Sequence, residues 1–492
     1  MMKLQDELRL KSALFETRRH FLKQCTSGLG MMALGAMVGG CGSGKKIGQP
    51  VVMNPLDPKL THFAAKAKSV IFLHMCGSPS QLELWDYKPE LAKLDGQPCP
   101  PSFLEGKKFA FIRGVPDMLG SVGQFKQHGQ SGAWISDYFT HLPQAADEIA
   151  FLKAMYTDQF NHAPAQLFMH TGSARLGRPS MGSWVTYGLG SENANLPGFV
   201  VLTSGGKAPD AGKSVWGSGF LPSVYQGVQC RSEGDPVLFL SDPNGLDRDL
   251  RKKAVEALSE VNRQQYEEFK DPETLARIAQ YEMAFKMQMS VPEVMDISKE
   301  PTYIHQLYGT EPGQSSFANN CLLARKLVEK GVRFVQLYDW GWDTHGDGKG
   351  TSLEFGLRDK VNQIDQSITA LLLDLKQRGM LDETLVVWGT EFGRTPMQEN
   401  RNGKKMPFKG RDHHTDAFTC WMAGGGVKRG FSMGESDELG YFGIKDRTHI
   451  HDLQATILHQ LGFNHEEFTY EFQGRNFRLT DVSGKVIHKV IA

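Results

Sequence analysis

The sequence lacks any excess of charge of one sign, any regular cysteine framework and, beyond its first 40 residues, any long apolar run. Its 55 lysine and arginine residues balance 55 aspartate and glutamate residues, whereas a nucleic-acid-binding protein would show a basic face. The cysteines after Cys41 are widely spaced and form no CxxC pair. This spacing does not indicate a disulfide framework, although one bond could form outside the cytoplasm. We expect no nucleic-acid partner.

The amino terminus has the pattern of an export signal. Arg18 and Arg19 are followed by Phe21-Leu22-Lys23, which matches the bacterial twin-arginine signal. The apolar segment 28–40 is glycine-rich and shorter than the roughly 18 residues of a membrane-spanning helix, as in a signal-peptide core. We therefore predict export through the twin-arginine translocation machinery to the periplasm or cell envelope.

Cys41 follows the small residues Gly39 and Gly40, as at a lipoprotein cleavage site. This arrangement predicts a lipid anchor at Cys41; a cysteine that is there by chance is the alternative. A single acyl-type anchor with a flexible tether would attach an otherwise soluble domain to a membrane. The predicted organisation is a signal peptide over 1–40, a tether over 41–66 and one large domain over 67–492.

The rest of the chain alternates β-forming runs with helical periodicities, which predicts an α/β fold with a mainly parallel central sheet and helices on both faces. The predicted strands are 69–75, 148–155, 198–203, 332–338, 384–388 and 417–422. The predicted helices are 132–146, 163–170, 179–187, 248–289 (as a helix pair), 316–330, 354–377 and 452–461. Two aperiodic stretches, 97–130 and 204–245, are expected to form long rim loops, because loops of this length are usually functional or mobile. The tail 476–491 suggests a hairpin around Ser483-Gly484.

The segment Trp340–Asp347 has the strongest pattern for a functional site. It follows a run of β-forming residues, and functional groups of open α/β sheets gather at the carboxyl ends of strands. Asp343 and His345 could bind one metal ion or serve as a base and its orienting partner; a solvated loop is the alternative.

Other polar clusters sit at predicted strand or helix ends. They contain Glu83 and Asp86, Asp158 and His162, Glu391 and Arg394, and Arg411 to His414.

Several stretches resemble an exported bacterial family that is catalogued as a domain of unknown function, DUF1501. They are GSPSQLELWDYKP, QHGQSGAW, DQFNHAPAQLFMHTG, GWDTHGD, TEFGRTP, GRDHHTDAF and AGGGVKRG, spread over nearly the whole mature chain. That family is placed with the alkaline phosphatase and sulfatase superfamily. The resemblance implies an alkaline phosphatase/sulfatase-like α/β domain that binds one or two metal ions.

The resemblance also implies site residues. Asp343 and His345 resemble the first metal-binding pair of the superfamily, and Glu391 stands where a later Asp-His pair would begin. Either His413 or His414 resembles the last metal-binding histidine. The expected cofactor is a divalent cation (Zn, Mn, Ca or Mg) bound by these residues.

The sequence departs from the superfamily pattern at three positions. His162 stands at the position of the usual serine, threonine or formylglycine nucleophile, Phe392 replaces a histidine, and no aspartate follows the first strand. We expect His162 to act as nucleophile or general acid/base, with Arg394 and Arg411 as forked oxyanion contacts.

The predicted function is a metal-dependent hydrolase of phosphate or sulfate esters, with a small-molecule or glycan ester as substrate. The alternatives are a non-catalytic metal-binding envelope protein that recognises sulfated or phosphorylated glycans and, third, a purely structural lipoprotein.

Overall fold

The computed structural model describes residues 54–107, 109–231, 248–269, 271–401 and 403–492. The predicted signal peptide and Cys41 lie outside these residues, as does part of the predicted rim loop 204–245. Among the described helices, none has the length and apolar composition of a membrane span.

One central sheet contains the long strands. In spatial order these are β14 (Phe431–Met433), β4 (Ile149–Tyr156), β13 (Phe418–Ala423), β8 (Thr384–Gly389), β1 (Ser69–Cys76), β7 (Phe334–Trp340), β5 (Phe199–Ser204) and β6 (Val228–Cys230), and β17 (Thr448–His449) pairs with β4. Neighbouring strands are parallel except for β13, which is antiparallel to both β8 and β4. All six predicted strands are present, and the predicted mainly parallel α/β fold is confirmed.

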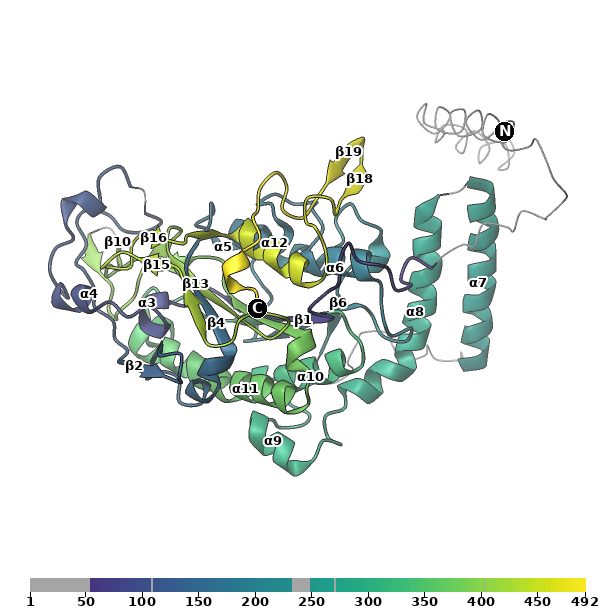
Figure 1. Ribbon diagram of the computed structural model, residues 1–492, viewed down its shortest axis with the longest axis horizontal. Coiled ribbons are helices and arrows are strands. Elements are labelled where there is room, and N and C mark those ends of the chain that lie inside the picture. Colours follow the sequence, from purple (N-terminus) through teal and green to yellow (C-terminus); the bar gives the residue numbers. More distant parts are fainter. Residues whose placement is uncertain (1–53, 108, 232–247, 270, 402) are drawn as a thin grey trace, which may run out of the picture. The chain divides into compact units, whose positions relative to one another are not determined.

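Helices cover both faces of this sheet (Figure 1). Successive side chains of a strand point to opposite faces, so Ile71 and Leu73 of β1 pack in one apolar core with α10 and α11, whereas Val70 and Phe72 pack in a second core with α5, α6 and α12. The bounds are Phe317–Glu329 for α10, Arg358–Gln377 for α11, His162–Thr171 for α5, Met181–Leu189 for α6 and Ile450–Gln460 for α12. These helices agree with the predicted ones.

The predicted helix pair is confirmed as α7 (Arg248–Phe269) and α8 (Pro272–Met295). The Asp271 carboxylate accepts a hydrogen bond from the Glu273 backbone N–H at 3.0 Å, and Pro272 occupies the first helical position, where its missing N–H has no cost. Three shorter helices are α3 (Gln81–Leu84), α4 (Pro89–Lys93) and α9 (Thr302–Tyr308).

Short two-stranded sheets form in the loops outside the central sheet. They are β2 (Phe125–His128) with β3 (Ala133–Ser136), β9 (Gly393–Arg394) with β12 (His413–His414), β10 (Asn400–Arg401) with β11 (Lys404–Lys405), β15 (Glu435–Ser436) with β16 (Gly443–Lys445), and β18 (Tyr470–Phe472) with β19 (Arg475–Phe477). The β9–β12 ladder places His413 opposite Arg394, which matters for the site described below.

Two secondary-structure predictions were wrong. Residues 132–146 form β3 and then a 3-10 helix, Leu142–Glu148, instead of one α-helix. The backbone N–H groups of Thr140, His141 and Leu142 donate to the Asp365 carboxylate, which holds the chain in a turn where a helix was expected.

The carboxyl-terminal hairpin lies earlier in the chain than predicted. It turns at Gln473 and Gly474, both at positive φ (50° and 77°), as a two-residue turn between antiparallel strands requires. No strand pair forms around Ser483-Gly484 within the described tail.

Candidate metal centre

The carboxyl-terminal edge of the central sheet gathers the polar segments singled out in the sequence. Strands β7, β1 and β8 are neighbours, so Asp343, Gly77 and Glu391, which follow them, meet at one edge. Because β13 runs in the opposite direction, its amino-terminal end lies at the same edge and brings His413 there. Helix α5 begins with His162 after β4. The sheet topology therefore brings together groups far apart in sequence.

The Asp343 carboxylate lies at the centre of this cluster. His345 Nε2 is 2.9 Å and His413 Nε2 is 3.6 Å from Asp343 Oδ1, and His162 Nε2 is 3.4 Å from Oδ2. The Asp343 side chain is 36% exposed, whereas the three imidazoles are largely buried. Three ring nitrogens thus face one carboxylate that solvent can reach.

His413 has a well-defined tautomer. Its Nδ1 lies 2.8 Å from the carbonyl oxygen of Phe160, and because a carbonyl only accepts, Nδ1 must carry the hydrogen. Burial, opposed by the nearby Asp343 carboxylate and assisted by Arg394, lowers the pKa of His413 to about 4. Its Nε2 faces the Asp343 carboxylate at 3.6 Å and has no hydrogen-bond partner among the described residues, so this nitrogen is available to a cation.

Carboxylates hold the outer nitrogens of the other two imidazoles. His162 Nδ1 lies 2.8 Å from Glu391 Oε1, and His345 Nδ1 is hydrogen-bonded to Glu399. Burial lowers the pKa of both rings, but the neighbouring carboxylates, Asp343 included, raise it more, to about 9 for His162 and above its ordinary value for His345. A second-layer carboxylate on the far nitrogen is typical of metal-binding histidines.

Glu391 lies behind His162, away from the Asp343 carboxylate. Its Oε1 accepts from the Gly77 backbone N–H at 2.9 Å, from His162 and from Gln166 at 3.2 Å, and its Oε2 lies 3.2 Å from His74 Nε2. Burial raises the pKa of Glu391, but the His162 and His74 contacts lower it more, so it stays well below its usual range. The predicted metal ligand Glu391 is thus occupied in orienting His162.

Gly77 is required by the close approach of two chain segments. Its φ is +113°, and a Cβ there would lie 2.5 Å from the Asp343 backbone nitrogen. The backbone N–H of Gly77 therefore reaches Glu391 at the point where the sequence lacks the superfamily's aspartate.

Arg394 compensates the charge of Asp343 from the buried side of the cluster. Its Nη2 donates to Asp343 Oδ1, while Nε and Nη1 donate to the carbonyl oxygens of Ser78 (2.8 Å) and Arg411 (3.0 Å). Burial raises the pKa of Asp343, but Arg394 and the imidazoles lower it far more. Because the Arg394 side chain is fully buried, a substrate oxyanion does not reach it, and the predicted oxyanion role does not fit this placement.

Arg411 is a structural residue. It forms a forked pair with buried Glu83 (Nη2 to Oε1, 2.7 Å), and its other N–H groups donate to the carbonyl oxygens of Leu119, Thr395 and Gly120. A guanidinium has five N–H donors, and all of them have protein acceptors here. The predicted oxyanion contact is therefore not supported for Arg411 either.

His414 points away from the cluster. It follows His413 in the extended β12, where neighbouring side chains alternate in direction, and its ring stacks on Tyr441 with Nε2 hydrogen-bonded to the Tyr441 carbonyl. Of the two predicted histidines, only His413 faces Asp343. His414 is not supported as a ligand.

Sequence reasoning missed Glu399, Gln166 and His74, which hold His345 and Glu391 in place. Glu399 is fully buried although it lies in a polar stretch, and nothing in its local sequence marks it.

The sequence indicated Asp412 only as part of a polar run. It accepts backbone hydrogen bonds from Phe111, Ile112 and His413, so its carboxylate fixes a rim loop to the site.

The donor set fits a divalent cation. One ring nitrogen each from His162 and His413 and a carboxylate oxygen of Asp343 lie within 4.8 Å of one another, and both Nε2 atoms are buried without a hydrogen-bond partner among the described residues. Two imidazoles and one carboxylate with a position open to solvent form a common catalytic zinc set. His345, Glu399 and Asp412 form a second group of this kind, but the Asp412 oxygens already accept backbone N–H groups.

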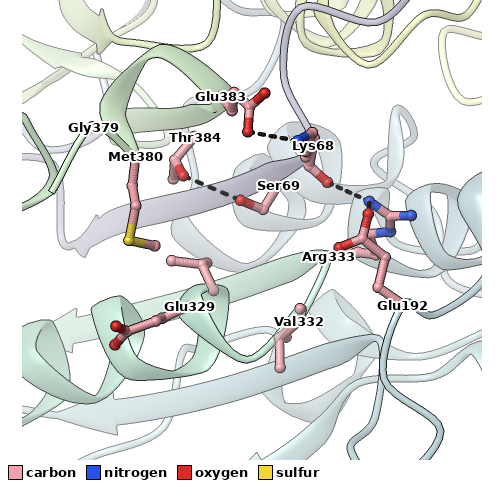
Figure 2. Close-up of a pocket in the computed structure, with 12 residues that line it drawn as sticks. Lys68, Ser69, Glu192, Glu329, Val332, Arg333, Gly379, Met380, Glu383 and Thr384 are labelled. Carbon is pink, nitrogen blue, oxygen red and sulfur yellow. Dashed lines mark hydrogen bonds and ion pairs between the residues drawn. The ribbon is translucent and has the colours of Figure 1, made fainter.

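A cavity of about 350 Å³ lies at the opposite, amino-terminal edge of the strands (Figure 2). Ser69 and Thr384, at the starts of β1 and β8, line it. Four of its charged groups form pairs, Lys68 with Glu383 and Arg333 with Glu192, both at 2.7 Å. None of the histidines near Asp343 lines this cavity, so it is separate from the candidate metal centre.

The structural role of Arg411 leads to a stability prediction. Arg411→Leu would leave Glu83 buried and unpaired, so the free energy of unfolding should fall by about 3–5 kcal/mol, measured by urea denaturation. The double variant Glu83→Leu/Arg411→Leu should recover most of this loss, because it removes both charges. An Arg411→Leu variant as stable as wild type would contradict this role.

Comparisons with known proteins give one family match. Residues 67–491 match the family described as "Protein of unknown function (DUF1501)", and a search of curated proteins finds no match. Among solved structures, the chain is similar to the PsFucS1 sulfatase from Pseudoalteromonas sp. (12% identity, 82% of this chain and 69% of that chain covered, TM-score 0.35). It is also similar to the alkaline phosphatase from the Antarctic bacterium TAB5 (11% identity, 73% and 92% covered, TM-score 0.28).

The family match extends over almost the whole described domain and includes every segment that contributes to the Asp343 cluster. The family predicted from the sequence motifs is thereby confirmed: the chain belongs to the DUF1501 family.

Proposed function

We propose that this protein is a metal-dependent hydrolase of phosphate or sulfate esters, with one divalent cation at Asp343. The observation that supports it is the convergence of His162 Nε2 and His413 Nε2 on the Asp343 carboxylate, at 3.4 and 3.6 Å. A carboxylate oxygen of Asp343 and these two ring nitrogens lie within 4.8 Å of one another, as the ligands of one cation do. The ester class itself is the one implied by the sequence motifs.

His162, Asp343 and His413 would hold the cation, and His345 lies beside the same carboxylate. A bound divalent cation supplies Lewis acidity and lowers the pKa of a bound water. Glu391 fixes the Nδ1–H of His162 and leaves its Nε2 free to bind. Glu399 holds His345 Nδ1 in the same way, and His345 Nε2 lies against the Asp343 carboxylate at 2.9 Å, where it is placed to exchange a proton with a reacting group. The Asp343 side chain is the solvent-exposed part of the cluster, so a substrate would approach the cation from there.

The alternative is a non-catalytic metal-binding protein that recognises sulfated or phosphorylated glycans. It is favoured by the imidazole of His162 at the position where an oxygen nucleophile would stand, held between Glu391 and Asp343. Turnover decides between the two proposals.

The first prediction concerns metal content. Purified wild-type protein should contain about one divalent cation per chain by elemental analysis, and His413→Gln should lose it, because the Nε2 donor is gone. The matched variant His414→Gln should keep the cation, since that ring stacks on Tyr441. Glu391→Gln should weaken metal affinity by about 10- to 100-fold, as expected for an outer-shell partner. Equal metal content in the His413 and His414 variants, or no metal and no thermal shift with Zn, Mn or Ca, would refute the metal centre.

The second prediction concerns turnover. Wild-type protein should hydrolyse at least one phosphate or sulfate mono- or diester and lose this activity on chelation. His345→Gln should retain the metal but lose about 10²- to 10⁴-fold in kcat, the usual contribution of a general acid or base. His162→Ala should lose both metal and turnover; a variant that keeps the metal and loses only turnover would make His162 the proton carrier. Turnover that survives complete metal removal would contradict the proposal.

We further propose that the protein is exported by the twin-arginine route and anchored through a lipid on Cys41. The sequence pattern before Cys41 supports this, and the location would expose the site to substrates outside the cytoplasm. Wild-type protein should then partition with membranes and Cys41→Ala should be released. Equal partitioning of the two in a fractionation experiment would refute the anchor.

A further inference from the structure

The arginines that sequence patterns suggest for substrate contact are both buried, but a third arginine lies at the rim of the same site. Arg401, at the end of β10, has a side chain 39% exposed. Only its Nε has a protein partner within the described part of the chain, donating to Glu399 Oε1 at 2.8 Å. The two terminal nitrogens carry four N–H donors, and these are directed to no described protein group.

Arg401 is tied to the metal centre by two independent contacts. Through Glu399 it connects to His345, because the other oxygen of that carboxylate is hydrogen-bonded to His345 Nδ1. Through Phe111 it connects to the same imidazoles: its guanidinium carbon lies 4.7 Å from the centroid of the Phe111 ring, which meets His345 and His413 edge-on at 5.0 and 5.7 Å. The guanidinium is therefore held beside the cluster while its outer N–H groups remain available.

The loop that carries Phe111 is itself fixed to the site. The backbone N–H groups of Phe111 and Ile112 donate to Asp412 Oδ2 at 2.8 and 3.0 Å, and the Arg113 backbone N–H donates to Asn400 Oδ1 at 2.9 Å. Asn400 precedes Arg401 directly. The guanidinium and the ring beneath it are thus positioned together by the same loop.

We propose that Arg401 is the residue that binds the anionic group of the substrate, a phosphate or sulfate oxyanion, at the open side of Asp343. This proposal rests on the proposed hydrolase function and names the part of that site that selects anionic over neutral esters. A guanidinium with both terminal nitrogens free offers parallel N–H donors that match two oxygens of a tetrahedral oxyanion. The exposed part of the Phe111 ring provides an apolar surface beside the bound anion.

The test compares Arg401→Gln and Arg401→Lys with wild type and with Arg429→Gln. Arg429 is a suitable control, because it is 47% exposed and pairs with Glu148 and Asp382, neither of which lines the metal centre. Binding of inorganic phosphate and of sulfate is measured by calorimetry on the metal-loaded proteins. In parallel, KM and kcat are measured for an aryl phosphate, an aryl sulfate and a neutral aryl acetate. Metal content is determined for each variant.

Arg401→Gln should weaken binding of the preferred anion by about 10- to 100-fold, the range expected for lost charge-assisted hydrogen bonds. It should raise KM for the anionic ester by a similar factor, change KM for the neutral acetate much less, and retain the metal. Arg401→Lys should recover only part of the binding, since a single ammonium cannot donate in a fork. Arg429→Gln should behave as wild type.

Two results would overturn the inference. Anion binding by Arg401→Gln that equals wild type, or that is absent from both, removes Arg401 as the anion contact. Loss of metal along with anion binding would instead make Arg401 a positioning residue for Glu399 and His345. A failure of the hydrolase proposal is distinguishable, because it would show as wild-type protein that binds the anion without turning over any ester.

Discussion

The negative charge of Asp343 is the constraint around which this domain is organised. A carboxylate near a protein interior must be compensated, because moving an unpaired charge out of water is costly. Here compensation comes from Arg394 on one side and from His162 and His345 on the other, and the third imidazole, His413, faces the same carboxylate. Each imidazole is oriented by a different acceptor: Glu391 after β8, Glu399 in a rim loop, and the Phe160 carbonyl before α5. The cluster therefore exists only when the sheet has brought all of these segments to one edge.

Burial separates arginines that support the site from an arginine that can bind substrate. Arg394 and Arg411 are fully buried and direct their N–H groups to carboxylates and carbonyl oxygens of the surrounding loops. They stabilise the rim by satisfying acceptors that would otherwise be stranded in the interior, where an unpaired polar group is expensive. Arg401 makes a single hydrogen bond through Nε and stays partly exposed. The chemistry of the three side chains is the same, so only their environment assigns their roles.

The sequence allowed the central strands and the principal site segment to be predicted, because both depend on local pattern. A run of β-forming residues followed by Asp343 and His345 places those groups at a strand end without further information. The choice between His413 and His414 could not be made locally, since alternation in β12 means that one faces the site, and the pairing of His413 with Arg394 decides which. Glu399 was missed because its partner His345 lies 54 residues away. The helix expected over 132–146 failed for the same reason: Asp365, 225 residues from Thr140, captures the backbone N–H groups there.

The surroundings of Glu391 bear on how many cations the site can hold. A carboxylate offers about four lone-pair positions, and Glu391 already has five neighbouring polar groups within 3.2 Å, from Gly77, His162, Gln166, His74 and Thr390. The neighbouring Phe392 presents a buried phenyl ring 4.9 Å from His162 and 4.5 Å from His413, so it adds no ligand. Hydrogen-bond donors of the protein therefore stabilise the Glu391 carboxylate, which needs no second cation for this. If a cation binds at Asp343 as proposed, Glu391 would therefore not be available to bind a second one.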